Sequence, residues 1–128
     1  MRVQLISANA ASTPYSVYPL GMSMVAASLS EAGHEVHQSD LIQSDMSMDA
    51  IADVVRGYAP DMIGISIRNI DNVNLLNEKI YIDVVSQLVE RVREETESPV
   101  ILGGSGFSIM PETILRVTKA DYGIVGEG

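Results

Sequence analysis

The stretch DMIGISI, residues 61–67, decides the fold, because it is an apolar run long enough for a strand that is buried on both faces. Similar runs are RVQLIS at residues 2–7 and PVILGG at 99–104, the second of which ends at paired glycines. The segment HEVHQSD, residues 34–40, is less apolar and suits a strand at the edge of a sheet. DYGIVGEG, residues 121–128, predicts a fifth strand with a glycine-flanked end. The three most apolar runs are expected at the centre of one sheet.

Helices are predicted between these strands. Three of them show apolar residues at helical spacing: Met22, Val25, Ala26 and Leu29; Ile51, Val54, Val55 and Tyr58; and Tyr81, Val84, Val85, Leu88, Val89 and Val92. Gly33 stands where the first helix needs a C-cap, and Ser47 is the expected N-cap of the second. The third helix is expected to end near Thr96. A short fourth helix has Pro111 in its first turn and runs to about Lys119.

Strand and helix therefore alternate along the chain without a repeat or a linker. This alternation predicts an α/β fold: a flavodoxin-like (Rossmann-like) doubly wound five-stranded parallel sheet in the order 2-1-3-4-5, with right-handed crossovers and helices on both faces. No helix follows the fifth strand in the sequence. We therefore expect residues 1–128 to form one domain, the first part of a longer protein.

Composition argues against several classes of function. The 128 residues include 8 basic and 17 acidic side chains, a net charge of −9, and the chain has no basic cluster to suit nucleic acid or an anionic membrane surface. Cysteine is absent, which removes disulfides, thiolate metal sites, cysteine nucleophiles and an iron–sulfur cluster held by this chain, and fits a cytoplasmic protein. Prolines, a glycine and hydroxyl residues interrupt the uncharged stretch 7–30, so we expect no membrane span there.

Long and unusual loops gather at one end of the predicted sheet. The loops that follow the carboxyl ends of the strands cover residues 7–21, 66–79, 103–110 and 126 onward, whereas the loops at the opposite end are short. Ligands of doubly wound sheets bind outside the carboxyl ends of the strands. The sequence therefore predicts a ligand site at this end.

Several sharper motifs are missing. The chain has neither a phosphate loop with its lysine nor G-x-G-x-x-G after the first strand, so Asp40 is weak support for a dinucleotide. Asn9 and Ser66 stand at strand ends where a phospho-acceptor domain has acidic residues. His34 and His37 have no nearby cysteine or paired carboxylates, so we expect no metal site there. No catalytic residue is expected in this chain.

Four segments together resemble a known family: YPLG at 18–21, GISIRNIDN at 64–72, LGGSGFS at 102–108 and DYGIVGEG at 121–128. The set is similar to the N-terminal cobalamin-binding domain of cobalamin-dependent radical S-adenosylmethionine enzymes, over essentially the whole chain. The wider cobalamin-binding fold carries D-x-H-x-x-G, then S-x-L, then G-G.

The match to this pattern is partial. Gly21 can match the last glycine of the first element, Ser66 the serine of the second, and residues 103–104 the paired glycines. Residues 7–21 contain neither Asp nor His, and Arg68 stands where S-x-L has leucine.

The resemblance implies a cobalamin site at the carboxyl ends of the strands. The implied contact residues are Ser7, Asn9, Tyr15, Tyr18, Leu20, Gly21, Ser66, Arg68, Asn69, Gly103, Gly104, Ser105, Gly106, Phe107, Gly126 and Glu127. Ser66 is the candidate to hydrogen-bond the benzimidazole end of the nucleotide tail. Without a histidine in the first loop, cobalamin is expected base-off and without a histidine lower ligand.

The resemblance also implies that this chain is a cofactor module rather than a complete enzyme. A following radical S-adenosylmethionine domain would hold a [4Fe-4S] cluster, through C-x-x-x-C-x-x-C, and S-adenosylmethionine. The implied chemistry is methyl transfer from cobalamin or a related radical reaction.

Other interpretations stay open from the residues themselves. A flavodoxin-like domain that binds FMN or a nucleotide phosphate, or an interaction domain without a cofactor, is the alternative, since SANAAST at 7–13 supplies hydroxyls after the first strand. Against a phosphate site, Pro14 and Pro19 are expected to hold the chain extended there. A tight strand exit would equally explain the glycines at 103–106, and a local backbone hydrogen bond would explain Ser66.

Overall fold

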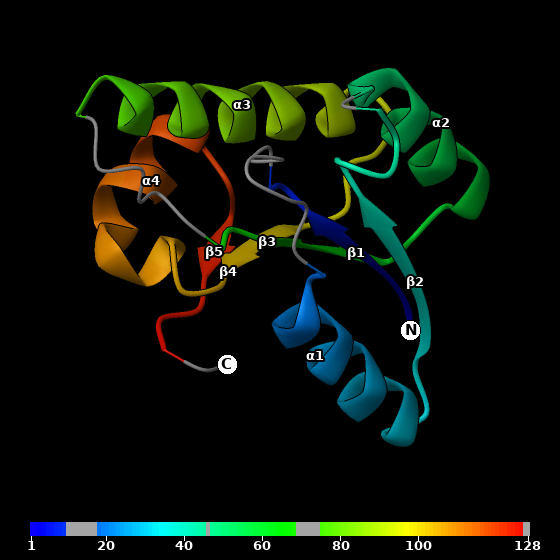
Figure 1. Ribbon diagram of the computed structural model, residues 1–128. Coiled ribbons are helices and arrows are strands. Elements are labelled where there is room, and N and C mark those ends of the chain that lie inside the picture. Colours follow the sequence, from blue (N-terminus) through cyan, green and yellow to red (C-terminus); the bar gives the residue numbers. More distant parts are fainter. Residues whose placement is uncertain (10–17, 46, 69–74, 127–128) are drawn as a thin grey trace.

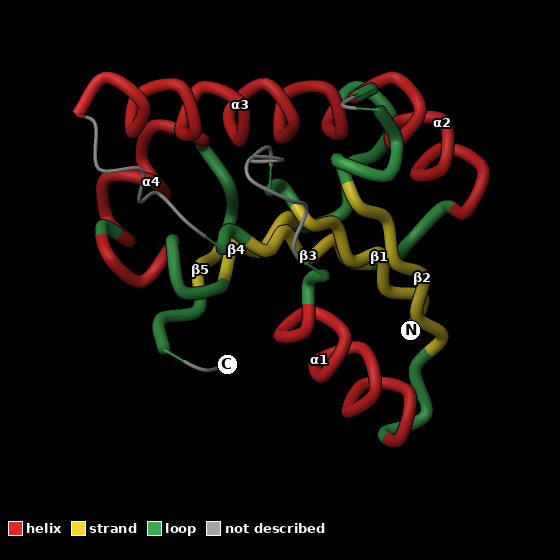
Figure 2. The backbone as a smooth tube through the Cα atoms, viewed as in Figure 1, coloured by secondary structure: helices red, strands yellow, loops and turns green. Residues whose placement is uncertain are grey.

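A computed structural model describes residues 1–9, 18–45, 47–68 and 75–126 (Figure 1). The elements are β1 (Arg2–Ser7), α1 (Leu20–Glu31), β2 (Glu35–Asp40), α2 (Met48–Tyr58), β3 (Met62–Ser66), α3 (Leu75–Arg93), β4 (Val100–Gly103), η1 (Phe107–Ile109), α4 (Pro111–Thr118) and β5 (Tyr122–Gly123). The five strands form one all-parallel sheet in the order β2-β1-β3-β4-β5, which confirms the predicted topology (Figure 2).

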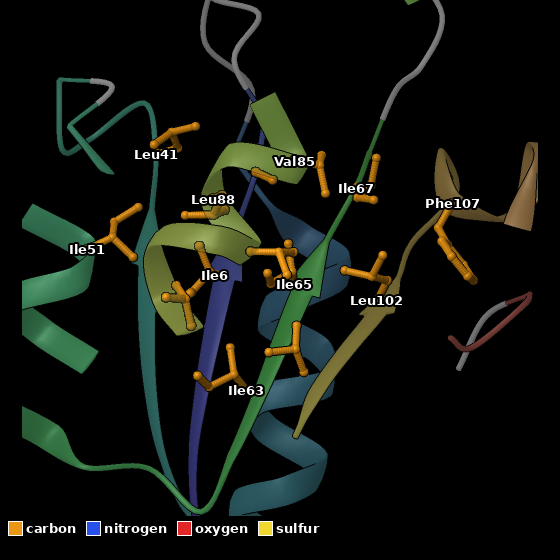
Figure 3. Close-up of a cluster of buried hydrophobic side chains, with 14 of the residues drawn as sticks. Ile6, Leu41, Ile51, Ile63, Ile65, Ile67, Val85, Leu88, Leu102 and Phe107 are labelled. Atoms are coloured by element: carbon orange, nitrogen blue, oxygen red, sulfur yellow. The ribbon is translucent and has the colours of Figure 1, made fainter. Parts of the chain in front are cut away.

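Helices cover the two faces of the sheet unequally. Helices α2, α3 and α4 lie on one face, and α1 is the one described helix on the other (Figure 1). The main core lies under α2, α3 and α4, and its large, fully buried side chains include Ile6, Leu41, Ile51, Ile63, Leu88, Leu102 and Phe107 (Figure 3). A smaller cluster of Val3, Leu5, Met22 and Ala26 joins α1 to β1. In the described part of the chain, α1 is therefore the single helix that covers this face of the sheet, and much of the face has no helix over it.

The helix ends follow local rules. Gly33, with φ +91°, ends α1 in a Schellman motif: its N–H donates to the Ser30 carbonyl, and the N–H of His34 donates to that of Leu29. The Ser47 hydroxyl accepts a hydrogen bond from the Ala50 N–H at 3.1 Å and caps α2, as predicted.

Three element boundaries differ from expectation. Helix α3 ends at Arg93 rather than Thr96, because the Thr96 hydroxyl accepts from the Ser98 N–H and turns the chain toward β4. Helix α1 begins at Leu20, inside the expected loop. Strand β5 has only two residues, Tyr122 and Gly123, which pair with Ile101 and Leu102 of β4.

Among the predicted core positions whose burial the structure describes, Val25 is the exposed one. Met22 and Ala26 of α1 are buried, but Val25 is 39% exposed. The reason is that α1 contacts the sheet with a narrow stripe and has no described helix beside it. No helix in the described part of the chain combines the length and the apolar character needed to cross a membrane.

Candidate ligand-binding site

Small side chains line the α1 face of the sheet at its carboxyl edge. Ser7 pairs with Ser66, and Ser66 pairs with Gly103, so these residues form one row across β1, β3 and β4. The row faces α1, because Val3 and Leu5, which alternate with the core-facing residues of β1, pack against that helix. Serine and glycine leave the strand backbone within reach of a flat group laid against this face.

The glycines after β4 divide into two kinds. A Cβ built on Gly103 has no neighbour closer than the Ile124 carbonyl oxygen at 3.9 Å, so the space beside this residue is open. Gly104 has φ +101°, and a Cβ there would lie 2.5 Å from the Ile67 carbonyl oxygen. A Cβ on Gly106 would lie 3.0 Å from the same oxygen. Gly103 therefore leaves room for a ligand, whereas Gly104 and Gly106 leave room for the chain's own backbone.

Hydroxyl groups at this edge also differ in their contacts. Ser66 is half-buried, and its carbonyl oxygen accepts a hydrogen bond from the Ala8 N–H at 3.0 Å. The Ser105 hydroxyl donates to the carbonyl oxygen of Arg68 at 2.5 Å. Ser105 thus binds the loop after β3, while Ser66 presents its side chain on the α1 face.

Ser108, which the sequence did not predict as a site residue, links two loops at this edge. Its hydroxyl donates to the Gly104 carbonyl oxygen at 3.1 Å and accepts from the Gly126 N–H at 2.9 Å. Gly126 has φ +89°, so a glycine suits this turn. The available signal was a serine four residues after a glycine, which is the spacing of a side chain that bonds back to a carbonyl.

The first predicted loop contributes mainly through the start of α1. Leu20 and Gly21 form the first turn of this helix and are exposed, and Tyr18 just before it is 64% exposed. The Tyr18 hydroxyl is 2.7 Å from that of Ser23. Asn9 is half-buried directly after β1. These residues lie at the same edge as the row of small residues (Figure 1).

Four predicted contact residues are placed differently or not described. Phe107 is 1% exposed and packs in the main core, on the face away from α1 (Figure 3). Its ring lies against Gly123, where any Cβ would overlap it. Tyr15, Asn69 and Glu127 fall outside the described residues.

Both histidines of the chain lie away from the row. His34 precedes β2 at the amino edge of the sheet, and its Nδ1 is 3.2 Å from the amino group of Met1. His37 pairs in register with Gln4, and its Nδ1 is 3.0 Å from the Gln4 Oε1. Gln4 belongs to the face opposite α1, because it alternates with Val3 and Leu5. Within the described ranges, no three His, Cys, Asp or Glu residues gather where they could hold a metal ion.

The strongest charge pairing lies at the amino edge. Arg56 and Arg91 each hydrogen-bond the Glu95 carboxylate at 2.8 Å, and these hydrogen bonds lower the pKa of Glu95 to about 2. The N–H of Val100 donates to Asp121 at 2.8 Å and lowers the pKa of that carboxyl. These contacts hold α2, α3 and the starts of β4 and β5 together, opposite the candidate site.

The fold and the row of small residues together define a class: a flavodoxin-like domain that holds a cofactor at the carboxyl edge of its sheet. A family model described as B12 binding domain matches residues 6–128. The chain belongs to the B12-binding domain family, as the sequence resemblance predicted.

Known relatives share this domain as part of larger proteins. The tryptophan 2-C-methyltransferase of Streptomyces laurentii is 31% identical over 127 residues, which is 98% of this chain and 21% of that protein. The chain therefore spans about a fifth of the length of this curated relative. Two solved structures share the fold. The radical S-adenosylmethionine methyltransferase TsrM from Kitasatospora setae, with cobalamin and a [4Fe-4S] cluster bound, aligns with TM-score 0.85 and 24% identity over 96% of this chain and 22% of its own. The cobalamin-dependent S-adenosylmethionine radical enzyme OxsB aligns with TM-score 0.62 and 18% identity over 90% of this chain and 15% of its own.

Proposed function

We propose that this domain binds cobalamin against the α1 face of the sheet, at the carboxyl ends of β1, β3 and β4. The observation that carries the proposal is the row Ser7, Ser66 and Gly103, in which Ser7 is buried while Ser66 and Gly103 are partly exposed and let a flat ring approach β3 and β4 at the edge where this fold takes its ligands. Membership of the B12-binding family supports the same ligand. When bound, cobalamin supplies the cobalt–carbon chemistry, and this chain supplies binding and orientation.

The residues present fit such a group. The open space at Gly103 would be filled by any side chain, and the nearest atom to a Cβ there belongs to Ile124. Ser66 pairs in register with Gly103, which supports the proposal that its hydroxyl hydrogen-bonds the benzimidazole end of the nucleotide tail. Amide side chains and apolar rims of a large neutral ligand suit a surface of hydroxyls, glycine and exposed Leu20.

We expect cobalt to receive no lower ligand from a histidine of this chain. The chain contains two histidines, and both lie away from the carboxyl edge on the α1 side. We expect the bound cofactor to be base-off and histidine-off. In the electron paramagnetic resonance spectrum of the cob(II)alamin complex, cobalt lines without nitrogen superhyperfine splitting are expected. Splitting from a protein nitrogen would contradict this part of the proposal.

A retention assay tests the ligand. Purified domain is mixed with hydroxocobalamin or with FMN and then desalted. Retained red absorbance is expected, at equal strength in a Ser28→Ala control on the exposed side of α1. Retained yellow FMN without cobalamin would favour the flavin-binding alternative, and retention of neither would favour a cofactor-free interaction domain.

We further propose that the domain is the cofactor module of a cytoplasmic radical S-adenosylmethionine enzyme, in which methyl transfer or related radical chemistry takes place. Its similarity to the tryptophan 2-C-methyltransferase, to TsrM and to OxsB supports this assignment. Because this chain has no cysteine, a [4Fe-4S] cluster and its S-adenosylmethionine must be held by another domain.

The exposed apolar side of α1 is evidence for contact with a partner domain. Leu20 and Met24 are each 64% exposed, and the exposed side of the helix carries no charge before Glu31. The coding sequence downstream of residue 128 tests the assignment. It is expected to encode C-x-x-x-C-x-x-C, and its absence would overturn the radical-enzyme context while leaving cobalamin binding intact.

A further inference from the structure

One short segment joins the loops at the carboxyl edge. We propose that residues 103–108, here called the clasp, hold residues 67–68 after β3 and Gly126 after β5 in their ligand-ready arrangement before any cofactor binds. Ser105 and Ser108 are its positioning residues. The inference rests on the proposed cobalamin site, because that site is what the arrangement would serve.

The clasp holds the end of β3 by three hydrogen bonds. The Ile67 N–H donates to the Gly103 carbonyl oxygen at 2.8 Å, and the Gly106 N–H donates back to the Ile67 carbonyl oxygen at 2.8 Å. The Ser105 hydroxyl adds the third bond, to the Arg68 carbonyl oxygen at 2.5 Å. Three bonds in succession fix the backbone of residues 67–68, which lead out of β3 beside Ser66.

Glycine makes this approach possible. The backbone of Ile67 lies where a Cβ of Gly104 would be, 2.5 Å from the carbonyl oxygen and 3.0 Å from the nitrogen. Gly106 is similarly tight against Ile67 and Arg68. Gly104 and Gly106 therefore allow two loop backbones to touch, whereas Gly103 leaves open space.

The clasp reaches the other loop through Ser108. A hydroxyl can donate one hydrogen bond while accepting others, and Ser108 donates to the Gly104 carbonyl oxygen and accepts from the Gly126 N–H. Through the Ser108 hydroxyl, Gly126 after β5 is thereby linked to the Gly104 carbonyl oxygen in the turn after β4. Two serine side chains connect three loops that belong to three different strands.

The location of these bonds explains their purpose. The Ser105 and Ser108 bonds to residues 68 and 126 are exposed, so they add little to a core that is closed beneath them. Ordering loops on binding opposes affinity, and loops that are ordered beforehand avoid that loss. The Ser105 and Ser108 side-chain bonds therefore act on ligand affinity more than on global stability, whereas Gly104 and Phe107 of the same segment belong to the packed fold.

Hydrogen exchange on the ligand-free domain tests the clasp without reference to cobalamin. Removing one hydrogen bond of ordinary strength in Ser105→Ala is expected to speed exchange of the Gly106 and Ile67 amides by about 3- to 10-fold. The urea midpoint is expected to stay near that of the wild type. Ser105→Thr, which keeps the hydroxyl, should restore slow exchange, and Ser28→Ala serves as the control.

Cobalamin titration of the same variants supplies the second readout. Ser105→Ala and Ser108→Ala are each expected to weaken binding by about 3- to 10-fold. Unchanged amide exchange in Ser105→Ala would overturn the clasp, and faster exchange with unchanged cobalamin affinity would overturn its role in binding. If the variant exchanges faster but the wild type binds no cobalamin, the proposed cofactor fails while the clasp remains.

Discussion

Alanine at two adjacent glycines should have opposite effects. Gly103 and Gly104 are neighbours in sequence, yet only the first has open space around its missing side chain. Gly103→Ala is expected to impair ligand binding and leave the fold intact. Gly104→Ala is expected to destabilise the fold.

The magnitudes follow from the surroundings. At Gly104 an alanine must adopt φ +101°, a strain of about 1–3 kcal/mol. Its Cβ would also displace the Ile67 carbonyl oxygen and weaken the hydrogen bond that Gly106 donates to it, about 0.5–1.5 kcal/mol. Gly104→Ala should therefore lower the free energy of unfolding by about 2–4 kcal/mol.

Gly103→Ala should behave differently because its φ is not positive and its Cβ would have no neighbour within 3.9 Å. The expected change in unfolding free energy lies between zero and about 1 kcal/mol of stabilisation. A methyl group in the space for the cofactor is an overpacking of about 1–3 kcal/mol, which weakens cobalamin roughly 5- to 150-fold.

Urea unfolding and cobalamin titration of both variants measure the two effects. Gly57→Ala, in an exposed and open position of α2, is the control for adding a methyl group elsewhere. The reasoning would be refuted by a Gly104→Ala domain as stable as the wild type, or by a Gly103→Ala domain that binds cobalamin as tightly as the wild type.

Further predictions concern charge, core and hydroxyl. The lowered pKa of Glu95, about 2 against an ordinary 4.5, stabilises the fold fully above pH 4.5 and loses that contribution as the pH falls toward 2. Glu95→Gln should thus lower the urea midpoint at pH 7 and have a much smaller effect at pH 2, with exposed Glu97→Gln as the control; an equal effect at both pH values contradicts it. Phe107→Ala should destabilise by about 3–5 kcal/mol in urea unfolding, and a near-wild-type midpoint would show that the ring is not a core element. Ser66→Ala should weaken cobalamin about 3- to 10-fold at unchanged stability, whereas unaltered affinity by titration would remove this hydroxyl from the site.

The architecture was predictable because strand and helix patterns, each readable from a short stretch of sequence, alternate along the whole chain. Alternating apolar runs and helical spacings define the strands and helices, and the short loops leave few ways to connect them. The exposure of Val25 could not be predicted from the sequence, since it depends on which helices lie side by side on the α1 face.

The positions of the candidate site residues in the fold were predictable only in outline. The motif pattern placed Ser66 and Gly103 at one edge, and the strand register brings them together in one row with Ser7. The same pattern grouped Phe107 with them, although its side chain turns into the core because η1 starts there. One motif thus contains residues that face opposite sides of the sheet.

The contacts of the clasp were beyond the sequence. Whether a glycine admits a ligand or a neighbouring backbone depends on φ and on a segment about 37 residues away, as the bond from Ser105 to Arg68 shows. The start of α1 was also misjudged. Pro19 was expected to extend the chain but stands at the N-cap of the helix, where a missing N–H is tolerated.

A hydrogen-exchange footprint of hydroxocobalamin on the domain tests the central claim most directly. If cobalamin binds at the carboxyl edge on the α1 face, protection is expected at the carboxyl ends of β1, β3 and β4 and in the first turn of α1, with no change in the ion-paired ends of α2 and α3. Protection confined to α2 and α3, or no protection at saturating cobalamin, would contradict it.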